Sequence, residues 1–171
     1  IKPQKALIHS IYDVEHWRKG ELLSVTRDHN TVTNEGLDSL LGIMFSDVTQ
    51  ITDWYVLIFH TDTTPSSTTT YAVPGFTESN ATYDEATRPI YVEPGVVTQS
   101  ITNTASKATF TMNATATIYG AALIGGGSAA TTKGDTAGGG TMYCASQFAA
   151  SKAVVDDDSL KVSITLTAAD S

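Results

Sequence analysis

The chain is poor in cysteine, in basic residues and in long apolar runs, and each shortage excludes a class of protein. Its 171 residues include one Cys, which rules out a disulfide framework and a cysteine-rich metal site. Ten Lys and Arg stand against 18 Asp and Glu, so the net charge of −8 argues against binding nucleic acid phosphates. No apolar run reaches the roughly 18 residues of a membrane-spanning helix. We therefore expect neither a nucleic acid nor a membrane as a partner.

Threonine is the residue that the chain has in excess. Its 27 Thr outnumber all Lys and Arg together. Threonine suits pleated, half-buried strands, and the 13 Gly suit turns. With 41% hydrophobic residues the chain can also form a core, which argues against disorder. The composition predicts a β-rich globular protein.

One segment has the pattern of a helix. Within residues 33–45, Leu37, Leu40, Leu41 and Met44 fall at i, i+3, i+4 and i+7, so they share one apolar stripe. Thr33 or Asn34 can cap the helix start. The pattern predicts a helix that packs on a sheet through this stripe, and a helix that binds a partner is the less favoured alternative.

Most other segments have the pattern of strands. Residues 108–119 alternate apolar and polar side chains over twelve positions, which indicates one long strand with a bend midway. The apolar run 53–60 predicts a strand buried on both faces. The remaining expected strands span residues 6–17, 21–28, 88–93, 142–148 and 160–167. Without strand–helix alternation, these elements favour an all-β, jelly-roll-like antiparallel β-sandwich with one short α-helix.

Charge divides the chain into two parts. Residues 1–30 hold half of the basic side chains, whereas the stretch from Asp28 to Thr87 has no Lys or Arg. We therefore separate residues 1–28, an N-terminal arm or a pair of leading strands, from a sandwich domain at 29–171. The alternative is that this unevenness arises by chance in a weakly charged chain.

Several polar motifs could suggest chemistry, and none has the pattern of a known site. The glycine-rich stretch 125–140 lacks the Gly-Lys-Ser/Thr order of a phosphate loop. His60 and Asp62 lack a third ligand in sequence, and residues 156–158 lack the spacing of a calcium loop, which favours a solvated turn. Cys144 is expected to be a small buried hydrophobe. We expect no catalytic, cofactor or metal site.

Carboxylate pairs and assembled triads are the remaining enzymatic possibilities. Glu78 with Asp84 or Glu85 lies in a turn-rich stretch with no evident apolar pocket to raise a pKa. The chain has no Gly-x-Ser-x-Gly elbow, although Ser, His and Asp are all present and could assemble in space. A hydrolase remains a minor alternative to a protein that is not an enzyme.

The chain carries a series of short motifs whose order along the sequence matches that of a known family. Residues 29–40 read His-Asn-x-Val-Thr-Asn-x-Gly-Leu-x-x-Leu, and residues 54–58 read Trp-Tyr-x-Leu-Ile. Later matches are Phe76-x-Glu78 with Tyr83 and Arg88, Phe110-x-Met112 with Ala114, Ile118-x-Gly120 with Leu123, Ser146-x-Phe148, and Asp158-x-Leu160-x-Val162. One departure is Asp157, where the related proteins have Gly before Asp-x-Leu. The matched segments run from about residue 29 to residue 166.

These motifs, in this order, resemble small virion proteins of tailed phages, the capsid cement, or decoration, proteins. The resemblance implies a jelly roll on the outer surface of the virion head, where the protein binds the major capsid protein and forms a dimer or trimer. For capsid contacts we single out Lys2, Lys5, Trp17 and Arg18, because Trp and Arg are enriched at interface hot spots. Trp17 capping the chain's own sandwich is the alternative.

A second interpretation is a receptor- or glycan-binding module of a tail fibre or tail tip. Exposed aromatic side chains near loop ends would favour it. The candidates are Tyr71, Tyr83 and Tyr91.

Overall fold

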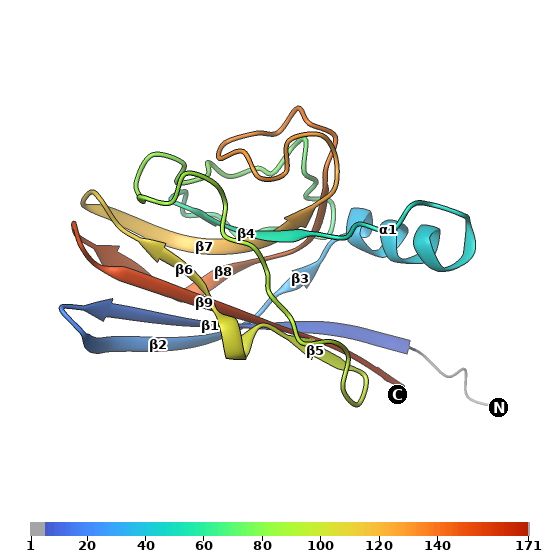
Figure 1. Cartoon of the computed structure of the whole chain (residues 1–171), viewed down its shortest axis with the longest axis horizontal. Coiled ribbons are helices and arrows are strands. Elements are labelled where there is room, and N and C mark those ends of the chain that lie inside the picture. The colour runs from blue at the N-terminus through green and yellow to red at the C-terminus, as the bar shows by residue number, and fades with distance from the viewer. Residues whose placement is uncertain (1–5, 171) are drawn as a thin grey trace.

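Two antiparallel sheets packed face to face form the body of the protein, which a computed structural model describes for residues 6–170 (Figure 1). The first sheet contains β1 (Ala6–Arg18), β2 (Glu21–His29), β5 (Ser100–Thr102), β6 (Ala108–Thr111) and β9 (Ser159–Asp170). The second contains β3 (Thr31–Val32), β4 (Trp54–Phe59), β7 (Ala116–Gly125) and β8 (Thr141–Val154). The helical elements of the described chain are α1 (Asn34–Phe45) and a short 3-10 turn, η1 (Thr104–Ser106). The predicted all-β sandwich with one short α-helix is confirmed.

The strand order joins the two ends of the described chain. The first sheet runs β2-β1-β9-β5, with β6 also paired to β9, and the second runs β3-β8-β7-β4. β1 pairs with β9 along its length, from Ala6 opposite Asp170 to Trp17 opposite Ser159. Residues 6–28, for which the sequence left an arm or leading strands open, are therefore the two leading strands of the first sheet, and β1 lies between two neighbours.

The core lies between the sheets and follows the period of two that strands require. Tyr12 and Val14 of β1 meet Ile58 of β4, Phe110 of β6 and Leu123 of β7 there, all of them buried. Because β1 supplies two of these side chains, residues 6–18 cannot be removed without opening the core.

A second apolar cluster covers the outer face of the second sheet. Leu57 and Phe59 of β4 point away from the core and pack against Tyr71 and Phe76 from the loop that follows β4. The rings of Phe59 and Phe76 stack with centroids 4.1 Å apart. β4 is thus buried on both faces, as its apolar run predicts.

Two predicted strands differ from what the structure shows. The alternating segment 108–119 is two strands, because residues 112–115 carry the chain from the first sheet to the second between β6 and β7. Residues 88–93 form no regular strand; they lie beside β4 through one bridge, Ile90 to Tyr55, and the hydrogen bond from the Tyr91 amide to the Trp54 carbonyl. In both segments the apolar pattern marks burial and does not report strand length.

Helix α1 begins where the sequence predicts and packs differently. The Thr33 side chain caps it by accepting a hydrogen bond from the Gly36 amide at 2.9 Å. Gly36 is its one buried residue, whereas Leu41 and Met44 of the predicted apolar stripe are exposed. Leu37 and Leu40 are half-buried, so the expectation that this stripe packs on a sheet is wrong only for its second half, because only the first turns of α1 reach β8. Among residues 6–170, no helix has the length and apolar character needed to cross a membrane.

Candidate functional site

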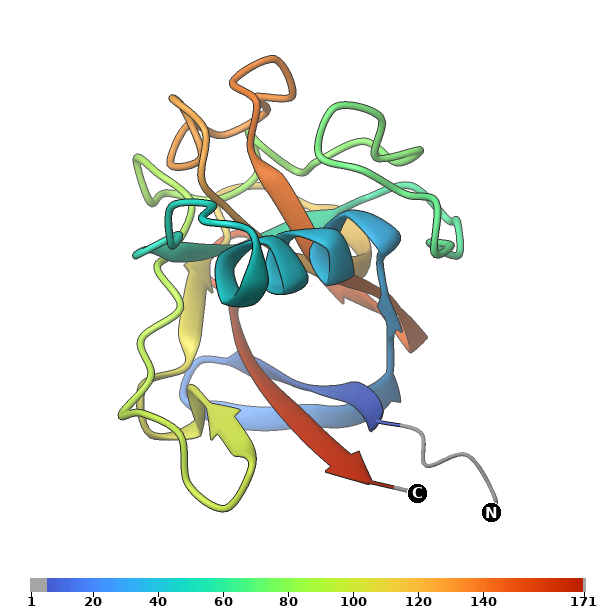
Figure 2. The same ribbon diagram turned by 90° about the vertical axis from the view of Figure 1, so that its right-hand side faces the viewer.

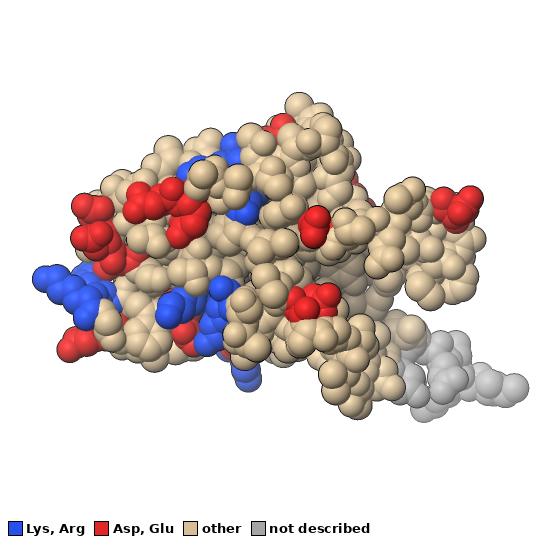
Figure 3. All heavy atoms as spheres, viewed as in Figure 1, with Lys and Arg blue, Asp and Glu red and all other residues tan. Residues whose placement is uncertain are grey.

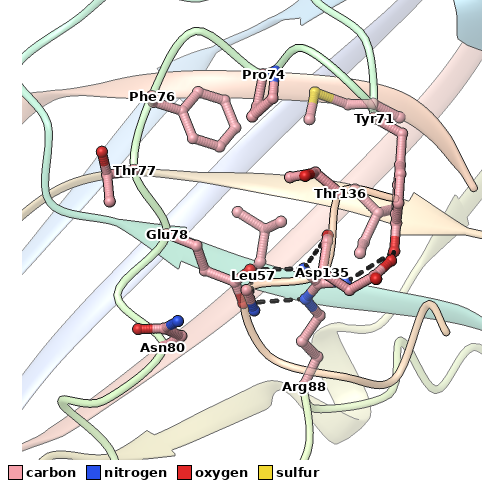
Figure 4. A pocket seen from close by; sticks show the side chains of 13 residues that line it. Leu57, Tyr71, Pro74, Phe76, Thr77, Glu78, Asn80, Arg88, Asp135 and Thr136 are labelled. Atoms are coloured by element: carbon pink, nitrogen blue, oxygen red, sulfur yellow. Dashed lines mark hydrogen bonds and ion pairs between the residues drawn. The ribbon is translucent and has the colours of Figure 1, made fainter. Parts of the chain in front are cut away.

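The most elaborate polar cluster of the described chain surrounds Arg88, beside a hollow of about 180 Å³ on the outer face of the second sheet (Figure 4). Arg88 is only 2% exposed. Its guanidinium donates two hydrogen bonds to the Glu78 carboxylate, at 2.9 and 2.6 Å. It also donates to the Tyr71 hydroxyl at 3.2 Å and to the carbonyls of Ala130 and Asp135 at 3.0 and 2.9 Å. These contacts join the loop after β4 to the glycine-rich loop between β7 and β8.

The groups of this cluster bind one another. A guanidinium has five N–H donors, and the five hydrogen bonds of Arg88 use all of them. The hydrogen bond from the Tyr71 hydroxyl, helped by that of the Gly138 amide, lowers the pKa of Asp135. Burial raises the pKa of Tyr71. Because all donors of Arg88 are used within the cluster, its role is to hold the two loops together, and we call it the Arg88 clasp. The hollow beside it is lined in part by the apolar side chain of Leu57.

The carboxylates that the sequence grouped with Glu78 lie in separate contacts. The Glu85 carboxylate accepts a hydrogen bond from the Thr111 amide at 3.1 Å, and Asp84 is exposed. Glu78 is therefore an ion-pair partner of Arg88 and not half of a carboxylate pair. Contrary to the expectation of no pocket, it does line an apolar hollow.

A second buried cluster holds the turn before β9. The Asp158 carboxylate is fully buried and accepts hydrogen bonds from Arg18 Nε and Nη2 at 2.7 and 2.8 Å. His16 Nε2 lies 2.8 Å from the same carboxylate, and the Val155 amide donates to it at 2.9 Å. The hydrogen bonds from Arg18 hold the pKa of Asp158 well below its usual range. The solvated turn predicted for residues 156–158 is correct for the first two residues and wrong for Asp158.

The four predicted capsid contacts fall into two groups. Trp17 is half-buried on the outer face of the first sheet, where its Nε1 donates to Glu15 and the Lys161 ammonium lies 5.0 Å from its ring centre. Arg18 is bound to Asp158. Lys2 and Lys5 lie outside the described residues.

The other singled-out side chains have internal partners or are buried. His60 Nδ1 lies 3.1 Å from Ser79 Oγ, whereas Asp62 accepts a hydrogen bond from Gln147 at 2.6 Å. Within residues 6–170, no three His, Cys, Asp or Glu gather as a metal site would require. Cys144 is buried, as expected, and its burial raises the pKa of the thiol to about 11.

The tyrosines invoked for glycan binding are not exposed. Tyr71, Tyr83 and Tyr91 are all buried, and the hydroxyls of Tyr71 and Tyr91 donate to Asp135 and to the Ile164 carbonyl. They offer no open aromatic platform for a sugar.

One buried charged side chain was not predicted from the sequence. Lys152 of β8 points inward beneath β2, where its ammonium donates to Ser24 Oγ at 3.0 Å. Burial lowers the pKa of Lys152. Asp28, also buried, accepts the Ala149 amide through one oxygen at 2.8 Å. Nothing in the alternation of β8 distinguishes a lysine that points inward from one that points outward.

The surface that stands out is α1, which lies at one end of the sandwich (Figure 1) and crosses that end when it is viewed face on (Figure 2). Its N-terminal turn is fixed tightly. The Glu35 carboxylate accepts hydrogen bonds from the Tyr71 and Met142 amides at 2.9 and 2.6 Å. Gly36 lies so close to β8 that an added Cβ would come within 2.5 Å of the Tyr143 carbonyl oxygen. The helix is therefore held at its start and projects at its end.

Four large apolar side chains are exposed on the projecting half of α1 and the turn after it. They are Leu41 (56% exposed), Met44 (62%), Phe45 (79%) and Val48 (52%), which we call the α1 patch. Clustered exposed apolar side chains on a soluble domain mark interaction sites. The apolar periodicity signalled this face; what the sequence did not show is that it stays uncovered.

Comparison of the chain with protein-family models, with curated proteins and with solved structures gave no match.

Proposed function

We propose that this chain is a structural virion protein of a tailed phage, a cement protein without enzymatic activity that binds the major capsid protein on the outside of the head. The observation that carries the proposal is the α1 patch: a rigidly anchored helix that presents large apolar side chains to solvent. A protein partner that covers them gains the hydrophobic free energy that the isolated chain forgoes. The ordered motifs that resemble cement proteins supply the class of partner.

The mechanism is mechanical. A subunit that binds only the assembled, expanded shell stabilises that state by mass action, since its binding free energy is absent from the unassembled state. A specific interface of this kind buries about 1,200–2,000 Å² in total. Self-association as a dimer or trimer on the shell would add contacts between neighbouring copies.

The rest of the surface fits such a role. On the outer face of the first sheet, Asp13 pairs with Arg27, and Glu15 pairs with Lys107. Neighbouring positions of β6 and β9, such as Thr109 and Thr165, carry hydroxyls. A neighbour that approaches these positions meets paired charges and hydroxyls, and the Lys161 ammonium, which forms no ion pair with a described residue, lies over the Trp17 ring on the same face.

Electron microscopy tests the proposal directly. Purified chain is added to expanded heads that lack it, and bound density is located on the particles. We expect density at many equivalent positions over the head. A few copies at one vertex would identify a tail component instead, and bare heads at micromolar chain concentration would refute a role on the shell.

Point substitutions, and not a deletion, test whether the N-terminal residues contact the capsid. Deleting residues 1–20 would remove all of β1 and with it Tyr12 and Val14 of the core. Replacing Lys2 and Lys5 together by Gln removes two positive charges and leaves the sequence of residues 6–170 unchanged. If these residues contact the capsid, head binding weakens; equal binding would remove them from the interface.

A further inference from the structure

The α1 patch continues without interruption from the helix into the turn that follows. Leu41, Met44, Phe45 and Val48 are spaced at i, i+3, i+4 and i+7, so the first three share one helix face. Val48 folds back on the helix: its amide donates to the Gly42 carbonyl at 3.3 Å, and its side chain lies against Gly42. The absence of a side chain at Gly42 is what allows this contact. The patch is thus a preformed apolar knob.

Negative charge surrounds this knob. Asp38 and Asp47 are exposed beside it, and Asp53 follows before β4. None of the three forms an ion pair with another described residue. The C-terminal turn of α1 contains no basic residue, so the partial negative charge of the helix end is not neutralised either. Figure 3 shows acidic and no basic side chains among the described residues visible at this end of the molecule.

We propose that the α1 patch is the docking surface for the capsid shell, and that the shell surface it meets is an apolar depression rimmed by Lys or Arg. This inference rests on the proposed function and adds to it the residues and the chemistry of the contact. The knob supplies apolar anchors at the centre, and the acidic rim supplies the charges that steer and orient the encounter.

A second copy of the chain fits this surface poorly. A two-fold contact through the patch would bring Asp38, Asp47 and the helix end of one copy toward the same groups of the other, and like charges in an interface oppose association. Among the described cations, Arg18 is also bound to Asp158, and Arg27 and Lys107 are bound to carboxylates of β1.

The experiment measures binding of the full chain to shells assembled from the major capsid protein. The test variant carries Met44→Ser with Phe45→Ser. The matched control carries Val96→Ser with Val97→Ser, which are 70% and 69% exposed in the turn before β5 of the first sheet. Because all four side chains are exposed, both variants are expected to keep the far-UV circular dichroism spectrum and melting temperature of the parent. We expect the α1 variant to bind at least about 10-fold more weakly and the control to bind as the parent does.

A charge variant tests the second half of the inference. Asp38→Asn with Asp47→Asn should bind several-fold more weakly at low salt and lose less affinity on addition of salt than the parent does. Unchanged or tighter binding by this variant overturns the cationic rim, and unchanged binding of the Ser variant overturns the docking surface.

Two further outcomes distinguish a failure of the proposed function from a failure of the docking surface. If the parent chain fails to bind shells at all, the proposed function falls, and the inference with it. If light scattering shows a parent dimer that Met44→Ser with Phe45→Ser dissociates, the occupant of the patch is a second copy, which refutes the inference and leaves the function standing.

Discussion

The ion pair between Arg88 and Glu78 in the Arg88 clasp allows a quantitative prediction of how much stability is lost when either residue is replaced alone or both are replaced together. Replacing Glu78 by Leu leaves a buried guanidinium without its counter-ion. Replacing Arg88 by Met leaves a nearly buried carboxylate whose remaining donor is the Gly134 amide at 2.8 Å. Removing one member of a buried ion pair costs about 3–5 kcal/mol, whereas replacing both by apolar residues is often neutral. The double variant should therefore be more stable than the sum of the single effects allows.

The magnitude follows from the hydrogen bonds that each change removes. Glu78→Leu is expected to lower the free energy of unfolding by about 3–5 kcal/mol. Arg88→Met loses the same pairing and also the bonds to the Tyr71 hydroxyl and to the carbonyls of Ala130 and Asp135, at about 1 kcal/mol each. The double variant loses these three and also the hydrogen bond from the Gly134 amide to Glu78, about 4 kcal/mol in all. It should thus be more stable than Arg88→Met alone.

Urea unfolding followed by circular dichroism measures the three differences, and native-state hydrogen exchange locates them. Variants without Arg88 should exchange faster in the glycine-rich loop, residues 126–140, whereas Glu78→Leu retains the bonds from Arg88 to that loop and should perturb it less. Strictly additive effects of the two substitutions would show that the pair is not coupled. If Arg88→Met left the free energy of unfolding unchanged, Arg88 would not be what holds the two loops together. The hollow beside it would then again be a candidate ligand site.

Three further predictions concern pH and glycine packing. Asp158→Asn should destabilise the fold at pH 7 by about 3 kcal/mol in urea unfolding. Because the folded pKa of this carboxyl lies below its ordinary value of 3.8, its contribution is present above that pH and fades as the pH falls; an equal loss at pH 2 would contradict this. Burial raises the pKa of Cys144 from 9.0 to about 11 and that of Tyr143 from 10.0 to about 12, so stability should decline as the pH rises above 9, and less steeply in Cys144→Ala. Gly36→Ala should displace α1 from β8 and raise amide exchange along the helix, whereas Gly42→Ala meets only a side chain and should do so much less; equal exchange in the two would show that close packing does not fix the helix.

Much of the fold could be read from periodicity, because periodicity reports which side chains face the same way. The apolar run 53–60 predicted a doubly buried strand, and β4 is one. Periodicity does not report which element supplies the opposite wall. The alternation over residues 108–119 continues across a change of sheet, since Met112 stays buried while the chain crosses. The stripe on α1 was correct in position, but the partner of its second half is absent from residues 6–170.

The polar clusters could not be predicted from the sequence for a related reason. Arg88 joins Glu78, ten positions earlier, to carbonyls more than forty positions later, and no local pattern encodes such a meeting. Asp158 looked like one of three solvated aspartates because its neighbours are solvated, and only the approach of β1 makes it different. From the sequence, Trp17 could either contact a partner at the surface or cap the chain's own sandwich. In the structure its side chain is half-buried.

The shortage of cations has a different meaning once the pairs are known. Among the described residues, Arg18, Arg27, Arg88 and Lys107 each neutralise a carboxylate of the chain itself. Outside these four pairs the chain has 14 acidic and six basic side chains, whose difference is the net charge of −8, and the acidic ones include those around the α1 patch. Copies packed side by side repel one another only over about a Debye length, 8–10 Å at moderate salt, so neutral threonine-lined faces can still approach. Attachment through an apolar knob with an acidic rim then adds a directional attraction at one end of each copy, which orients it on a surface of opposite charge.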